Sequence, residues 1–111
     1  MIAIILAAGY GNRMRPLTDN EHKTLLKIND ITIIDNIIDS LIDNSVNNIV
    51  VVTGYRSEEL KNYLLNNYKD VNFQFVNNKD FKTTNNIYSL SLAFKNIKID
   101  TDIILIESDL I

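Results

Sequence analysis

The chain has 111 residues, of which 46% are hydrophobic and 23% are charged, and its formal net charge is −3 at pH 7. This length gives room for one globular domain, and the acidic balance excludes the broad basic field that would attract nucleic acids or anionic membranes. The sequence contains no cysteine, which excludes disulfide frameworks and thiolate metal sites and fits a reducing compartment. We therefore expect a cytoplasmic protein without a nucleic-acid partner.

The first element is a continuous β-branched run at residues 1–6, typical of a strand that is buried on both faces. The apolar run at residues 2–8 is too short to span a bilayer and lacks the basic leader of a signal peptide, so we expect no membrane insertion. A polar loop follows at residues 7–24. Periodicity then predicts, in chain order, a helix from Ile34 to Ile42, a strand at 48–53, a helix from Ser57 through Leu65, a strand at 71–76, a helix at 86–94 and a buried strand at 102–107.

This alternation of buried strands and helices predicts an α/β fold, a three-layer sandwich around a mainly parallel sheet, although the order of the strands is not visible in the sequence. The spacing of apolar residues also predicts which helix faces are buried. In the first helix the predicted stripe comprises Ile34, Ile37, Ile38, Leu41 and Ile42. In the last helix the predicted core residues are Ile87, Leu90 and Phe94.

The stretch LAAGYGNRMRPLTDNEHKTLL, residues 6–26, holds two of the three glycines and the only proline and histidine of the chain. It directly follows the first strand, and ligands of parallel α/β sheets bind at the carboxyl ends of strands. Glycines let the backbone amides approach an anion, and Arg13, Arg15 and Lys23 can neutralise a polyphosphate. The alternative is an ordinary loop with solvated charges. Met14 stands where a dinucleotide fingerprint requires glycine, and no Gly-Lys-Ser/Thr follows, so dinucleotide and P-loop sites are disfavoured.

As a whole, L-A-A-G-x-G-x-R-x-x-P-L-T followed by K-x-L-L resembles the signature of the nucleotidyltransferases that make nucleotide-diphosphate sugars and alcohols. The resemblance implies a Rossmann-like fold of the nucleotide-diphospho-sugar transferase type, with residues 1–111 as the N-terminal, nucleotide-binding part of a truncated domain. It also implies roles for individual residues. The residues expected to wrap the nucleotide are Leu6, Ala7, Ala8, Gly9 and Gly11, and the residues expected to contact phosphates during catalysis are Arg13 and Lys23.

Two further features are similar to the phosphocholine cytidylyltransferase branch of this family. His22 precedes the signature lysine where most sugar-nucleotide members carry proline, and the sequence N-N-I-Y-S occupies residues 85–89. An amide side chain can meet both a donor and an acceptor on a pyrimidine edge, so Asn86 is the expected base contact, with Asn85 and Ser89 as outer candidates. Either asparagine can also cap the following helix, which is compatible with base recognition. For His22 a loop residue that shapes the approach of Lys23 is favoured over a catalytic base.

The last predicted strand ends in Glu107 and Asp109, two carboxylates whose spacing puts both on one face of a regular strand. Hard oxygen ligands suit Mg²⁺ bound to substrate phosphates, whereas an isolated pair of this kind is ordinarily solvated charge. The resembled family carries its metal aspartate after this strand. We therefore expect Asp109 to be a Mg²⁺ ligand and Glu107 to be a second, weaker candidate.

The predicted function is transfer of CMP from CTP to a small phosphorylated acceptor such as phosphocholine, with release of pyrophosphate. The alternatives are a sugar-1-phosphate uridylyl- or thymidylyltransferase and a non-catalytic nucleotide-binding domain. Because members of the resembled family are about twice as long, we expect the isolated 111-residue chain to self-associate, as a homo-oligomer or less regular assembly, and to lack transferase activity.

Overall fold

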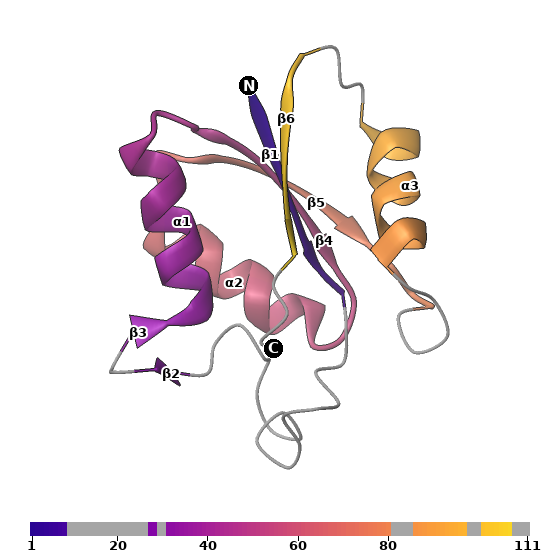
Figure 1. Ribbon diagram of the computed structural model, residues 1–111. Coiled ribbons are helices and arrows are strands. Elements are labelled where there is room, and N and C mark those ends of the chain that lie inside the picture. Colours follow the sequence, from indigo (N-terminus) through magenta and orange to yellow (C-terminus); the bar gives the residue numbers. More distant parts are fainter. Residues whose placement is uncertain (9–26, 29–30, 81–85, 98–100, 108–111) are drawn as a thin grey trace.

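The computed structural model describes residues 1–8, 27–28, 31–80, 86–97 and 101–107, and it forms the predicted α/β sandwich (Figure 1). A four-stranded parallel sheet has the order β5-β4-β1-β6, and a two-stranded antiparallel pair, β2 and β3, lies outside it. Helices α1 and α2 cover one face of the sheet and α3 covers the other. The elements are β1 (Ile2–Ala7), β2 (Lys27–Ile28), β3 (Ile31–Thr32), α1 (Ile33–Asp43), β4 (Asn48–Thr53), α2 (Ser57–Asn67), β5 (Asn72–Asn77), α3 (Asn86–Asn96) and β6 (Ile103–Glu107).

Strand β1 is central, because it pairs with β4 on one side and with β6 on the other. Ala3, Ile4, Ile5 and Ala7 are fully buried, as a strand covered on both faces requires. Leu6 is in register with Val52 of β4 and with Glu107 of β6. The first predicted strand is thus confirmed, and it places the start of the following loop at the middle of the sheet.

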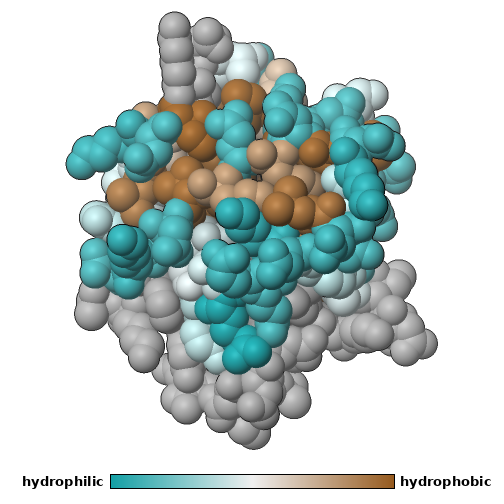
Figure 2. Space-filling view, turned by 180° about the vertical axis from the view of Figure 1, so that it is seen from behind, coloured by the Kyte–Doolittle hydropathy of each residue, from teal (hydrophilic) through white to brown (hydrophobic). Residues whose placement is uncertain are grey.

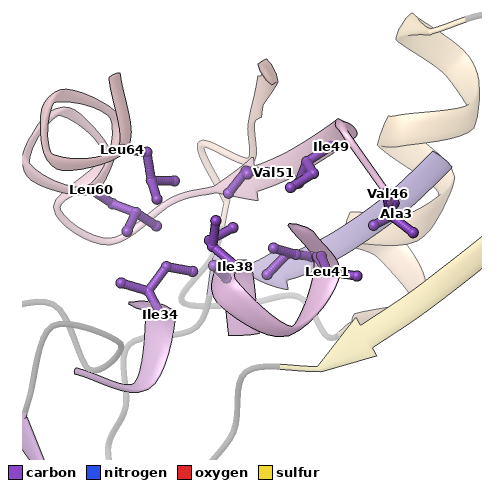
Figure 3. Packing of buried hydrophobic residues seen from close by; sticks show 11 residues of the cluster. Ala3, Ile34, Ile38, Leu41, Val46, Ile49, Val51, Leu60 and Leu64 are labelled. Carbon is purple, nitrogen blue, oxygen red and sulfur yellow. The ribbon is translucent and has the colours of Figure 1, made fainter. Parts of the chain in front are cut away.

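The larger core lies between the sheet and helices α1 and α2 (Figure 3). Its fully buried helical residues are Ile34 and Ile38 of α1 and Leu60 and Leu64 of α2. They pack against the alternate side chains of the strands, including Ile49 and Val51 of β4.

The predicted stripe of α1 is confirmed at its centre but wrong at one margin, where Ile42 is 37% exposed. Ile42 lies about 80° around the helix from Ile34, so it reaches the border of the buried face. The helix begins after Thr32, whose hydroxyl accepts a hydrogen bond from the backbone amide of Asp35 at 3.0 Å.

A cluster of polar side chains joins α1 to α2. The Asp35 carboxylate accepts hydrogen bonds from the Tyr63 hydroxyl at 2.5 Å and from the Tyr68 hydroxyl at 2.6 Å. The Tyr68 hydroxyl also lies 3.2 Å from Oδ1 of Asp39. Hydrogen bonds are directional, whereas the contacts of the apolar core are not. These bonds therefore fix the two helices relative to each other on the same face of the sheet.

The smaller core lies beneath α3, and its composition corrects one expectation. Phe94, predicted to be a core residue, is 48% exposed, while Ala93 is fully buried and Leu90 is partly buried. Helix α3 lies over β1, β4 and β5 with its small residues Ser89 and Ala93 against the sheet. Small side chains allow the helix to approach closely, and this turns the bulky Phe94 outward.

Strand β6 is also less buried than its apolar sequence predicts. Ile103 is 36% exposed and Leu105 is 44% exposed, whereas Ile104 and Ile106 pack against the larger core. The exposed pair lies on the face of α3, and the described part of that helix covers the other three strands rather than β6. Strand β6 is therefore an edge strand that is covered on one face only.

The opposite edge of the sheet is β5, where polar residues alternate with Phe73 and Phe75. The two rings are stacked with centroids 5.7 Å apart, and the Lys61 ammonium lies 5.7 Å from the centre of the Phe75 ring. From behind, hydrophobic side chains form a band bordered by hydrophilic ones (Figure 2). Across the described ranges, no helix is both long and apolar enough to cross a bilayer.

Candidate functional site

The strand order places a reversal point at the carboxyl ends of β1 and β6. From β1 the chain adds β4 and then β5 on one side, and it returns to add β6 on the other side of β1. The helices that make these connections accordingly lie on opposite faces of the sheet (Figure 1). Ligands of open parallel sheets bind at such a reversal point, because adjacent loops there diverge to opposite faces. The end of β1 at Ala7 and the end of β6 at Glu107 both lie at this place.

At this reversal point the side chains at the end of β1 are buried, so only its backbone is available to a ligand. Leu6, Ala7 and Ala8 are 2%, 0% and 4% exposed, and their side chains belong to the two cores. The carbonyl oxygen of Ala8 accepts a hydrogen bond from the backbone amide of Tyr55 at 3.2 Å, which ties the end of β1 to the segment after β4. Any contact of these three residues with a nucleotide would therefore use main-chain atoms.

The signature residues beyond Ala8 lie outside the described residues. This holds for Gly9, Gly11, Arg13, His22 and Lys23, so their predicted roles stay predictions. What the structure does establish is the point of departure of their loop, at the central strand and beside the reversal of strand order.

One of the two predicted metal carboxylates is described. Glu107 is the exposed last residue of β6, and it is in register with Leu6 of β1. Asp109 lies outside the described residues. Within the described ranges no three Asp, Glu, His or Cys side chains form a group that could hold a metal ion. The structure thus places one hard oxygen donor at the carboxyl end of β6, beside β1.

The predicted base-contacting residues surround the start of α3. Asn85 lies outside the described residues, and Asn86 is the first residue of the helix, with only its backbone described. Ser89 is 2% exposed, and its hydroxyl accepts a hydrogen bond from Nδ2 of Asn78 at 3.1 Å. Ser89 therefore has a structural partner beneath the helix, and its role as a nucleotide contact stays a prediction.

Asn78 is a buried polar residue that the sequence analysis missed. It directly follows β5 and is only 1% exposed. The available signal was a pair of asparagines at the carboxyl end of a predicted strand, which is where polar residues of functional sites gather in this class of fold.

A shallow hollow of about 420 Å³ lies after β4 and is lined by Gly54, Arg56, Ser57, Glu58 and Glu59. Helix α2 begins there as predicted, but Arg56 occupies the cap position in a left-handed conformation with φ 50° and makes no side-chain cap bond. A hydrogen bond of 2.8 Å to Glu59 raises the pKa of Arg56 and keeps its guanidinium paired. The hollow is a poor site for a polyphosphate because the carboxylates of Glu58 and Glu59 line it.

Comparison with known proteins identifies relatives over almost the whole chain. A sequence model of the nucleotidyl transferase family matches residues 2–111. The CTP:phosphoglutamine cytidylyltransferase of Campylobacter jejuni is 38% identical over 115 residues, which cover 100% of this chain and 44% of that protein. The choline-phosphate cytidylyltransferase of Haemophilus influenzae is 38% identical over 109 residues, which cover 95% of this chain and 45% of that protein.

A solved structure of the CTP:phosphocholine cytidylyltransferase of Streptococcus pneumoniae has the same arrangement of elements. It superposes with a TM-score of 0.81 at 35% identity, covering 97% of this chain and 45% of that one. The chain therefore spans less than half the length of each of these three relatives.

Proposed function

The chain belongs to the nucleotidyl transferase family, and from this premise we propose that the full-length protein transfers CMP from CTP to a small phosphorylated acceptor and releases pyrophosphate. The observation that carries the proposal is the departure of the signature loop from the central strand, at the reversal of strand order. The similarity to cytidylyltransferases at 38% identity supports CTP as the donor. Residues 1–111 would form the N-terminal, nucleotide-binding part of the catalytic domain.

The proposed reaction is an in-line displacement. A phosphate oxygen of the acceptor attacks the α-phosphorus of CTP, a new P–O bond forms, and the bond to pyrophosphate breaks. Catalysis of this kind consists mainly of positioning two anions and offsetting the charge that grows on the leaving group. Main-chain amides around Gly9 and Gly11 would hold the phosphates, while Arg13 and Lys23 would supply positive charge.

We also propose that the enzyme uses Mg²⁺. The exposed carboxylate of Glu107 at the end of β6 is a hard donor that suits this ion, and Asp109 would be the second carboxylate. When bound, Mg²⁺ supplies positive charge against the triphosphate. The chain's own contribution would be to hold Glu107 beside the end of β1, where it is in register with Leu6.

Two acceptors are favoured by specific relatives. The relatives from Haemophilus influenzae and Streptococcus pneumoniae are choline-phosphate cytidylyltransferases, and the one from Campylobacter jejuni acts on phosphoglutamine. We favour phosphocholine because the sequence features at residues 22–23 and 85–89 point to that branch. A cytoplasmic location is also proposed, on the basis of the lack of cysteine.

The test is a matrix of pyrophosphate-release assays on the full-length protein with Mg²⁺. The donors are CTP, UTP, dTTP, ATP and GTP, and the acceptors are phosphocholine, phosphoglutamine and glucose 1-phosphate. We expect release with CTP and phosphocholine. Release only with UTP or dTTP and the sugar phosphate would identify a sugar nucleotidyltransferase instead. Binding of CTP without release for any acceptor would identify a non-catalytic domain.

A further inference from the structure

The buried residue Asn78 bonds to three segments at the carboxyl ends of the strands through its backbone amide and its side chain. Its backbone amide donates to the carbonyl oxygen of Thr53 at the end of β4, at 2.6 Å. Its Nδ2 donates to the hydroxyl of Ser89 in α3 at 3.1 Å, and its Oδ1 accepts from the backbone amide of Asp80 at 3.0 Å. Both ends of the side-chain amide are therefore engaged in bonds within the protein.

Burial leaves the side chain of Asn78 no direct contact with a substrate. Asn78, Ser89 and Thr53 are 1%, 2% and 3% exposed. A buried amide that loses a hydrogen-bond partner destabilises the fold, because water cannot replace that partner. The geometry in which both the oxygen and the nitrogen of the amide are hydrogen-bonded is therefore strongly preferred. The cluster holds the turn after β5 and the start of α3 in one arrangement.

The bond to Ser89 acts close to the amino end of α3. Ser89 lies three residues after Asn86, so the two residues are one turn apart on the same side of the helix. The apolar contacts of Ala93, one further turn along, favour close approach but are not directional. The Asn78–Ser89 hydrogen bond is directional and resists rotation and sliding of the helix on the sheet.

We infer that Asn78 is a positioning residue that sets the first turn of α3 and thereby the enzyme's preference for cytosine over uracil. This inference rests on the proposed function and on Asn86 as the base-contacting residue. Cytosine and uracil differ at the 4-position, where one carries a donor and the other an acceptor. A side-chain amide can discriminate between them only if the turn that carries it is held still.

The test uses Ser89→Ala, Asn78→Ala and the double variant in the full-length protein. Ser89→Ala removes the hydroxyl with little change in volume, so folding is retained even if Asn78→Ala destabilises the protein. We expect Ser89→Ala to raise the KM for CTP roughly tenfold, the value of one hydrogen bond. The preference for CTP over UTP in kcat/KM should fall by a similar factor. The KM for phosphocholine should be unchanged, and kcat should change less than about threefold.

The double variant should be no worse than Asn78→Ala, because both changes delete the same bond. The matched control is Asn72→Ala, at the other end of β5, where Nδ2 of Asn72 donates to Oδ1 of Asn48 at 2.9 Å. This variant also loses a hydrogen bond between an asparagine and a neighbouring segment. The bond lies at the amino ends of β4 and β5, whereas the proposed site lies at the carboxyl ends of the strands. We expect its CTP preference to equal that of the wild type.

An unchanged CTP to UTP ratio in Ser89→Ala, or additive effects in the double variant, would overturn the inference. If the wild type releases no pyrophosphate, the proposed function fails, and calorimetric titration with CTP and UTP still tests the inference through the ratio of the two affinities. A wild type that binds neither nucleotide would overturn both.

Discussion

Replacing Tyr68 by Phe should lower the free energy of unfolding by about 1–2 kcal/mol at neutral pH. The substitution keeps the ring and removes the hydroxyl that donates to the Asp35 carboxylate at 2.6 Å. A hydrogen bond to a charged group contributes about 1.5–3 kcal/mol when it is well shielded, and the partial exposure of both residues favours the lower end of that range. Burial and the neighbouring Asp35 raise the pKa of the Tyr68 hydroxyl, so it remains a donor throughout the neutral range.

The charge of Asp35 makes this contribution pH-dependent. Burial, the largest single influence, raises the pKa of Asp35, but hydrogen bonds from Tyr63, Tyr68 and Thr32 together bring it below its ordinary value. A carboxyl whose pKa is lower in the folded chain stabilises the fold fully above its unfolded pKa of about 4. That contribution is lost as the pH falls through the lower folded value. The stability advantage of the wild type over Asp35→Asn should therefore diminish below about pH 4.

The assay is urea unfolding of the full-length protein as wild type, Tyr68→Phe, Asp35→Asn and the double variant at pH 7. Charge-assisted hydrogen bonds are roughly twice as strong as neutral ones, so Tyr68→Phe should cost about half as much in the Asp35→Asn background. Asn66→Ala, an exposed change on α2, is the control and should change stability by less than about 0.5 kcal/mol. An equal cost of Tyr68→Phe in both backgrounds would refute the role of the Asp35 charge.

Three further outcomes are expected. Arg13→Ala and Lys23→Ala should each reduce kcat more than they weaken CTP binding, because charge grows toward the transition state; unchanged turnover in both would remove their phosphate roles. Asp109→Asn should abolish activity without rescue by added Mg²⁺, while the circular dichroism spectrum is retained. Near-normal activity would show that Asp109 is an ordinary solvated carboxylate rather than a metal ligand. The 111-residue chain produced alone should self-associate in sedimentation velocity, and Leu105→Lys should reduce this association because Leu105 is 44% exposed on an edge strand; a monomeric chain would contradict this expectation.

The sequence by itself determined the elements of the main sheet and the class of the fold. Local periodicity records which side of a strand or helix avoids water, so the four strands and three helices lie within a few residues of their predicted positions. The short pair β2 and β3 was missed, because two-residue strands carry no periodicity. The signature loop was also found from sequence alone, since its glycines and cations are concentrated in one continuous stretch.

Only the tertiary structure decided how these elements meet. The central place of β1, and with it the reversal of strand order beside β6, depends on pairing between residues about 100 positions apart, which no local pattern encodes. The same holds for burial. Phe94 is exposed and Ala93 is buried because the sheet selects the helix face that fits closest. Asn78 gave only a weak polar signal at the end of a strand. Its importance arises from Ser89 and Thr53, partners 11 and 25 residues away that become neighbours only when the sheet and α3 assemble.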